Sequence, residues 1–138
     1  MKVRDIMVKE LATLDVNDEL SLANDIMRLG RILHLPVVDG TRLVGIISER
    51  DLFRSSLAQA LGYGTKATRD IMKTLRIKDV MVAEVVTVSP DSKLCDAVRV
   101  MLDKKIGCLP VVEDDRLVGL ITETDVLTQY LKDCGAME

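Results

Sequence analysis

The chain of 138 residues contains the same pattern twice, and this duplication constrains its fold more than any other feature. At an offset of 74 positions, residues 3–57 align with 77–131 without a gap, and about 21 of the 55 positions are identical. One such repeat is near the lower size limit for independent folding. The sequence therefore predicts two similar units that bury apolar surface against each other about an approximate twofold axis.

The first half of each repeat predicts a short strand followed by a helix. The strands fall at 11–14 and 85–88, and apolar residues at helical spacing follow each of them. Asn17 or Asp18 is suited to cap the first helix, and Ser89 the second, with Pro90 in its first turn.

The second half of each repeat predicts a strand pair and another helix. In the first repeat the strands fall at 35–38 and 43–47, and the sequence Asp-Gly-Thr at 39–41 is a good turn signal between them. A helix then begins at Ser48, or at Thr122 in the second repeat, and extends to about residue 60 or 131. The fold class is therefore α/β in composition (α+β), with the order β-α-β-β-α occurring twice.

These elements divide the chain into a first repeat at 1–60, a linker at 61–76 and a second repeat at 77–138. The linker contains the sequence RDIM at 69–72, which also occurs at 4–7 and is echoed by KDVM at 78–81. We interpret it as a connection with one amphipathic turn. An extra helix that covers a sheet edge or a partner is the alternative.

Composition excludes several classes of function. The net charge of −3 and the three aromatic residues supply neither a basic surface nor stacking platforms, which argues against nucleic acid as a partner. No apolar run is long enough for a membrane span, and the start of the chain lacks the apolar core of a signal peptide, so we expect a cytoplasmic protein. Three widely spaced cysteines, interpreted as buried small hydrophobes, and one histidine do not form a zinc motif.

The most distinctive motif is the change from apolar to polar residues at the end of each repeat's last strand. It reads GIISERD at 45–51 and GLITETD at 119–125. The spacing of hydroxyl and acid matches a helix capping box, which requires no ligand. The same helix start could instead attract a phosphate, with the acid holding the two hydroxyls of a ribose.

Each repeat resembles the cystathionine β-synthase (CBS) domain family in one pattern. The pattern reads LPVV, an acid, two residues, R-LVG, two apolar residues, Ser or Thr, Glu, one residue and Asp. Two such domains in tandem form the Bateman module, and the resemblance covers residues 1 to about 131. It implies adenosine-ligand sites in clefts between the repeats, for AMP, ADP, ATP or S-adenosylmethionine.

Carried over onto this sequence, the resemblance implies two sites, each with residues from both repeats. One site is expected to comprise Asp125, Thr122, Thr124 and Leu120, with Ala12, Ile32, Leu33 and His34 from the first repeat. The other is expected to comprise Asp51, Ser48, Arg50 and Ile46, with Val86, Ile106, Gly107 and Cys108 from the second repeat.

The two sites differ in charge beside the acid, because Arg50 in one corresponds to Thr124 in the other. We expect the Asp51 site to prefer phosphorylated ligands. Glu49 and Glu123 add negative charge within the motif. We expect them to face solvent; the alternative is that they recruit Mg²⁺ with a di- or triphosphate.

Three classes of function are compatible with these motifs. The first is a regulatory module that senses energy state or a metabolite and acts on a separate effector protein, with a homodimer implied by the resemblance. The second is a protein-interaction module whose clefts bind no ligand. The third, a metal-dependent nucleotide-processing enzyme, lacks a nucleophile motif or a Walker loop, so we expect no catalysis.

Overall fold

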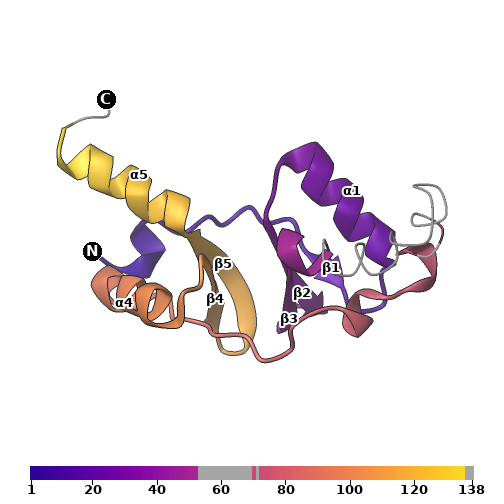
Figure 1. Ribbon diagram of the computed structural model, residues 1–138. Helices are drawn as coiled ribbons and strands as arrows, with labels where there is room; N and C mark the ends of the chain where they lie inside the picture. Colours follow the sequence, from indigo (N-terminus) through magenta and orange to yellow (C-terminus); the bar gives the residue numbers. More distant parts are fainter. Residues whose placement is uncertain (53–69, 71, 136–138) are drawn as a thin grey trace. The chain divides into compact units, whose positions relative to one another are not determined.

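The structure is a computed structural model that describes residues 1–52, 70 and 72–135 (Figure 1). The chain divides into two compact units, and neither is a continuous stretch of sequence. The first-repeat unit is Ala12–Val85, and the second-repeat unit combines Met1–Leu11 with Val86–Glu138. Each unit therefore includes the opening segment of the other repeat: residues 77–85 in the first-repeat unit and Met1–Leu11 in the second-repeat unit.

The first-repeat unit is built on three strands and a helix. Helix α1 (Leu20–Gly30) follows β1 (Leu14–Asp15), and β1 pairs in parallel with β2 (His34–Asp39). Strand β2 pairs antiparallel with β3 (Arg42–Ser48), with a register shift at Val37/Val38. A helix begins again at Glu49, and its described part ends at Leu52. The rest of its expected course to residue 60 lies outside the described residues.

The second-repeat unit repeats this order. Helix α4 (Leu94–Lys104) precedes the antiparallel pair β4 (Cys108–Glu113) and β5 (Arg116–Thr122), which has its register shift at Val111/Val112. Val88 forms only an isolated parallel bridge with Val111, in the place of a first strand. Helix α5 (Glu123–Asp133) follows β5. The predicted α+β class is confirmed, but the strand expected at 85–88 is reduced to this single bridge.

The turns between the paired strands have left-handed backbone conformations, as the sequence signal indicates. Gly40 has a φ of 66°, a conformation that glycine adopts without a steric penalty. The second turn achieves this with Asp114 and Asp115, whose φ values are 52° and 65°. Aspartate tolerates this region better than most other residues.

The predicted caps of the first helix in each repeat are wrong. Helix α1 begins one or two residues later than expected, with Glu19 as its N-cap residue and no side-chain cap hydrogen bond. The polar residues before it form a turn of their own, in which the carboxylate of Asp18 accepts from the Asp15 amide at 2.8 Å. Asn17 likewise donates its amide to the Asp15 carboxylate at 2.8 Å.

The same local competition displaces the cap in the second repeat. Ser89 uses its hydroxyl to accept from the Asp91 amide at 3.2 Å, and Pro90 is buried outside the helix. Helix α4 consequently starts after Lys93. Short polar side chains close turns as readily as they cap helices. The polar residues therefore do form local hydrogen bonds before each helix, but these bonds close a turn and do not cap the helix.

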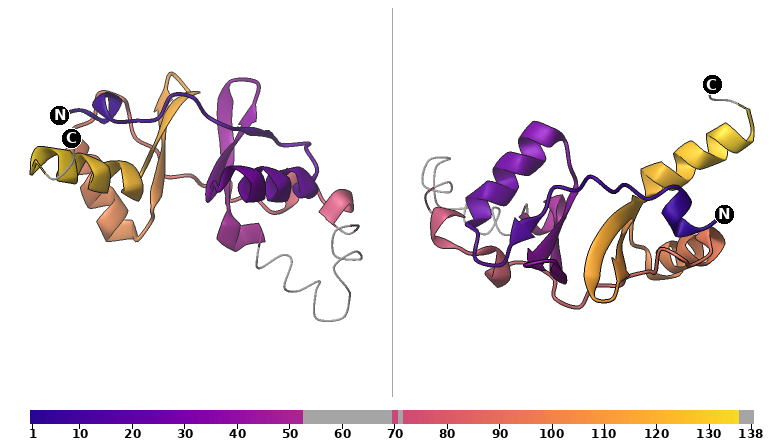
Figure 2. Two further views of the ribbon diagram at one scale, coloured as in Figure 1. Left: turned by 90° about the horizontal axis from the view of Figure 1, so that it is seen from above. Right: turned by 180° about the vertical axis from the view of Figure 1, so that it is seen from behind.

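The opening segment of each repeat packs on the unit built around the other repeat. Residues Val3–Asp5 form the short helix η1, and the Val3 amide donates to the Ser92 carbonyl in the second-repeat unit at 2.9 Å. Figure 2 shows this indigo segment beside α4. In the first-repeat unit, η2 (Ile77–Asp79) takes the same role, and the Ile77 amide donates to the Asp18 carbonyl at 2.9 Å.

These segments supply core residues. Ile77 is fully buried in the core of the first-repeat unit, and Val3 is fully buried in the core of the second. Met72, from the RDIM sequence of the expected linker, also lies in the core of the first-repeat unit. Residues 61–69 and 71 of the expected linker lie outside the described residues.

Candidate functional site

Each repeated polar motif forms a helix capping box. In the second-repeat unit, Thr122 is the N-cap residue of α5, and its hydroxyl accepts from the Asp125 amide at 3.4 Å. The Asp125 carboxylate accepts from the Thr122 amide at 2.8 Å and from its hydroxyl at 3.0 Å. The predicted helix start at Thr122 is therefore confirmed.

The same geometry occurs at Ser48 and Asp51 in the first-repeat unit. The Asp51 carboxylate accepts from the Ser48 amide at 2.9 Å and from its hydroxyl at 2.8 Å. In return, the Ser48 hydroxyl accepts from the Asp51 amide at 3.2 Å. In both units the two hydrogen bonds to the acid converge on Oδ2, and these bonds hold the carboxylate in one orientation. Both aspartates are half-buried.

A neighbouring strand lies against each helix start. His34 pairs with Ser48 across β2 and β3, and the Glu49 amide donates to the Leu33 carbonyl at 2.8 Å. In the second-repeat unit, Cys108 pairs with Thr122, and the Glu123 amide donates to the Gly107 carbonyl at 3.0 Å.

Within each unit, then, the residues before the LPVV strand adjoin the motif of the same repeat. These contacts group Leu33 and His34 with Ser48 and Glu49, and Gly107 and Cys108 with Thr122 and Glu123. The amides of Ile32 and Ile106 instead donate to the carbonyls of Met27 and Met101 on the preceding helices. The expected pairing of Asp125 with the first set and of Asp51 with the second stays a prediction.

The remaining expected site residues lie on the same elements. Ile46 and Leu120 are half-buried on the last strands, where they form backbone bridges with Val82 and Val8. Arg50 and Thr124 are exposed in the first helical turn, as are Glu49 and Glu123. Ala12 is exposed, whereas Val86 packs against the core of the second-repeat unit.

The glycine that begins each motif has a packing role that the sequence analysis missed. A Cβ atom on Gly45 would lie 2.5 Å from the Met81 sulfur and 3.1 Å from the Val82 carbonyl oxygen. On Gly119 it would lie 2.6 Å from the Met7 sulfur. Glycine therefore admits the opening segment of the other repeat. The signal was the recurrence of Met and Gly at matching positions in both repeats.

The thiol beside the second motif is held in its neutral form. Cys108 is buried, and burial together with the nearby negative charge of Asp125 raises the pKa of the thiol to about 12. Cys95 and Cys134 are exposed, which contradicts their interpretation as buried hydrophobes. His34 occupies the position of Cys108 in the first repeat, so the two helix starts differ in polarity at this point.

The described residues contain no cluster of histidine, cysteine and acidic side chains that could hold a metal ion. Nor does any helix within the described ranges have the length and apolar character needed to span a membrane.

A duplicated β-α-β-β-α unit with a capped acid after each last strand defines a class of tandem-repeat module. The chain belongs to the CBS domain family, whose model matches it twice, at residues 3–58 and 77–132. The expected family is thereby confirmed.

Solved structures share this fold over nearly the whole chain. The CBS domain pair of protein MJ0100, in complex with 5′-methylthioadenosine and S-adenosyl-L-methionine, is 30% identical with a TM-score of 0.79, covering 96% of this chain and 98% of that one. CBSX2 in complex with AMP is 28% identical with a TM-score of 0.80, with coverage of 96% and 98%.

Among curated relatives, an inosine-5′-monophosphate dehydrogenase from Methanocaldococcus jannaschii is 34% identical over 128 residues, which are 91% of this chain. The matched region spans only 23% of that enzyme, and 38% of the uncharacterized protein MJ1232 from the same organism.

Proposed function

We propose that the chain is a regulatory module that binds an adenosine-containing ligand at each of its two capped acids. The observation that carries this proposal is the doubly hydrogen-bonded carboxylate, built identically at Asp51 and Asp125. An oriented carboxylate can accept from both hydroxyls of a ribose, and the helix start beside it favours a phosphate. That CBS pairs of similar sequence have been solved with AMP and with S-adenosyl-L-methionine supports the ligand class.

The two sites are proposed to differ in preference. Arg50 is exposed in the first turn after Ser48, where its guanidinium can pair with a phosphate; the corresponding Thr124 carries no charge. The Asp51 site therefore takes AMP, ADP or ATP in preference to an uncharged nucleoside. With a di- or triphosphate, Mg²⁺ would enter with the ligand beside Glu49 or Glu123. A titration of Arg50→Ala with AMP and adenosine tests this, and equal losses for both would refute the phosphate role.

Regulation requires that the ligand bind one arrangement of the module more tightly than another, typically by about 1–3 kcal/mol. The module is proposed to act by binding, to form a homodimer and to pass its signal to an effector protein. An assay with ATP and Mg²⁺ checks the absence of catalysis, and sedimentation measures the oligomeric state.

The main test is a thermal-shift panel of AMP, ADP, ATP, NADH and S-adenosylmethionine. A ligand at 100 times its Kd should stabilise the protein by about 2.7 kcal/mol, which raises the Tm measurably. Asp51→Ala and Asp125→Ala should each remove one site's contribution. Because each change also removes a capping interaction, the ligand-induced shift is compared with the ligand-free Tm of the same variant.

The capping boxes also support a second candidate, a protein-interaction module without a ligand. The acids already stabilise their own helices, so their presence alone does not require a nucleotide. Failure of the whole panel to shift the wild-type Tm, or an unchanged shift in the double Asp51→Ala/Asp125→Ala variant, would favour this candidate.

A further inference from the structure

The opening segment of each repeat joins the last strand of the unit that receives it through a pair of backbone hydrogen bonds. In the second-repeat unit the Val8 amide donates to the Leu120 carbonyl at 2.8 Å, and the Leu120 amide donates to the Val8 carbonyl at 3.0 Å. Val82 and Ile46 make the same exchange in the first-repeat unit, at 2.9 and 3.0 Å. We call these pairs of bonds the two segment bridges.

The methionine that precedes each of these valines packs directly on a glycine of the same strand. A Cβ atom on Gly119 would lie 2.6 Å from the Met7 sulfur and 3.0 Å from its Cγ atom. A Cβ atom on Gly45 would lie 2.5 and 3.1 Å from the corresponding atoms of Met81. No free space therefore separates either thioether from the strand on which it packs.

Both of these methionines are also reachable from solvent. Met7 and Met81 are half-buried, and each packs at the edge of the core of its unit. Three other methionines of the described chain lie inside the cores and are each only 6% exposed: Met27, Met72 and Met101. A dissolved oxidant therefore meets the methionines that hold the opening segments more readily than those that fill the cores.

We propose that Met7 and Met81 are oxidation sites that control how tightly the opening segments are held. Hydrogen peroxide transfers one oxygen atom to the thioether sulfur: an S–O bond forms, the O–O bond breaks and water leaves. The sulfur is oxidised by two electrons, and the peroxide is reduced by two. The resulting sulfoxide loosens the segment bridge beside it. The inference goes beyond the proposed ligand sites and does not depend on them.

The sulfoxide does not fit where the thioether lies. Its oxygen is a strong hydrogen-bond acceptor, and the space beside each glycine is bordered by another acceptor. The Val8 carbonyl oxygen lies 3.2 Å from the Cβ position on Gly119, and the Val82 carbonyl oxygen lies 3.1 Å from that on Gly45. A sulfoxide oxygen that stays in this space is repelled and loses its hydration, whereas one that turns to water draws the sulfur off the glycine. Both arrangements weaken the packing of the methionine.

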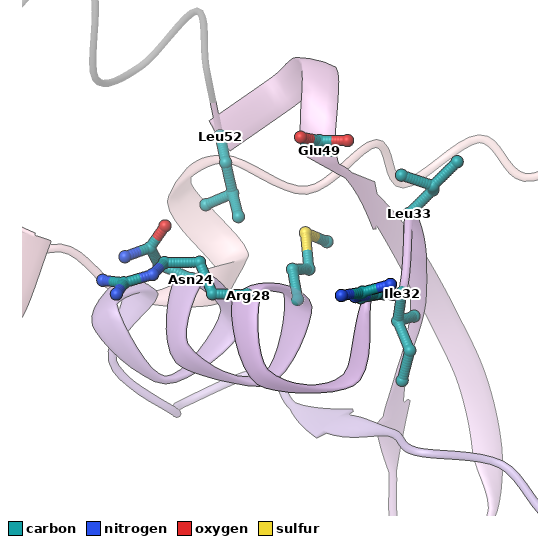
Figure 3. Close-up of a pocket in the computed structure, with 8 residues that line it drawn as sticks. Asn24, Arg28, Ile32, Leu33, Glu49 and Leu52 are labelled. Carbon is teal, nitrogen blue, oxygen red and sulfur yellow. The ribbon is translucent and has the colours of Figure 1, made fainter.

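Met27 is a stringent control for access of the oxidant. It lines a surface cavity of about 440 Å³ whose walls also include Leu33, Glu49 and Leu52 (Figure 3). Met27 itself is nonetheless buried in the core of the first-repeat unit. If proximity to a cavity sufficed for oxidation, Met27 would react as fast as Met81.

The first measurement compares oxidation rates in the full chain. Cys95→Ser and Cys134→Ser are introduced beforehand, because these exposed thiols also react with peroxide. Hydrogen peroxide is added in steps, and mass spectrometry of peptides measures the sulfoxide at each methionine. Met7 and Met81 should oxidise about tenfold faster than the core methionines or more, because a buried sulfur reacts only when its unit opens. Met1, which is 61% exposed, should react at least as fast.

The second measurement follows the segment bridges by amide hydrogen exchange. Oxidation of Met7 should speed exchange of the Val8 and Leu120 amides about tenfold or more, because burial of an unsatisfied polar group typically shifts an equilibrium by such a factor. Oxidation of Met81 should do the same for Val82 and Ile46. Amides in the middle of α5 should keep their protection, because the segment loosens while the unit stays folded.

The duplication provides a matched control for each site. In Met7→Leu, peroxide should no longer speed exchange at Val8 but should still speed it at Val82, and Met81→Leu should give the reverse. Met7→Gln, whose side chain is polar like the sulfoxide, should speed exchange at Val8 without peroxide. Because leucine is branched, a chain with norleucine in place of every methionine is a second control. Norleucine is unbranched and lacks sulfur, so peroxide should leave both bridges unchanged.

Three results would overturn the proposal. Oxidation of Met7 and Met81 no faster than that of Met27 and Met101 would show that the packed thioethers are closed to peroxide. Complete conversion of Met7 to the sulfoxide with unchanged exchange at Val8 would show that the site accommodates the added oxygen. Equal acceleration of exchange throughout the unit, α5 included, would show that oxidation unfolds the unit and does not loosen one segment.

Discussion

The first-repeat and second-repeat units have the same strand register but different side chains around the helix start. His34 pairs with Ser48 as Cys108 pairs with Thr122, and the register shift falls at the same place in each strand pair. Beside this shared backbone, Arg50 corresponds to Thr124 and Leu33 to Gly107. The side chains beside the two acids can therefore diverge in chemistry while the fold that positions the acids stays the same.

The largest effect on stability is expected when one core side chain is removed from each unit in turn. Leu35 and Leu109 are fully buried counterparts. Leu35→Ala and Leu109→Ala should each lower the free energy of unfolding by about 2–5 kcal/mol, measured by urea denaturation, because each leaves a cavity. Leu29→Ala, at a side chain 87% exposed, is the control and should have little effect. A small loss for only one of the core variants would show that the two units do not pack equivalently.

A smaller effect is expected at the two glycines that admit a methionine. Gly45→Ala and Gly119→Ala should each cost about 1–3 kcal/mol, because the new methyl group overlaps the methionine sulfur. Combining Gly45→Ala with Met81→Ala should cost less than the sum of the two changes. Additive losses in that double variant would contradict the proposed contact.

A third test uses the raised pKa of the Cys108 thiol, which has no counterpart in the first repeat because His34 stands at that position. Because the folded protein raises the pKa of the Cys108 thiol from 9.0 to about 12, its contribution to stability is complete below pH 9 and is lost as the pH rises toward 12. Raising the pH from 10 to 11 should lower the free energy of unfolding by about 1.3 kcal/mol relative to Cys108→Ala.

The smallest effect is expected for the cap hydroxyls. Ser48→Ala and Thr122→Ala should each cost about 1 kcal/mol, because each removes the acceptor for an amide in the first helical turn. Thermal unfolding monitored by circular dichroism measures the change. Thr124→Ala, two residues into α5, lacks this bond and should be nearly neutral. Similar losses for Thr122→Ala and Thr124→Ala would argue against the capping box.

Local patterns in the sequence predicted much of the architecture. Alternating apolar strands, the turn at Gly40 and the helix start at Thr122 each depend on residues close together in the chain, and the structure confirms them. The caps at Asn17 and Ser89 failed because the same polar groups also close turns. Sequence periodicity does not decide between these two local uses.

The exchange of opening segments could not be predicted by the same means. Self-alignment groups Met7 with its own repeat, whereas the structure places its sulfur against Gly119 in the other. Likewise, the capped acids could be located from sequence, but the cavity beside Glu49 depends on the volumes of Leu33 and its neighbours. Repeats show which residues are equivalent, and contacts must be determined separately.

The exchange also bears on the ancestry of the chain. Val3 and Ile77 each complete the core around the opposite repeat, so a precursor with one repeat would have lacked a piece of its own interior. Two identical precursor molecules could have supplied it by trading their leading peptides, as in a domain-swapped dimer. Gene fusion would then have made that reciprocal exchange permanent within one polypeptide, leaving each half free to evolve its own chemistry while it still takes one core segment from the other.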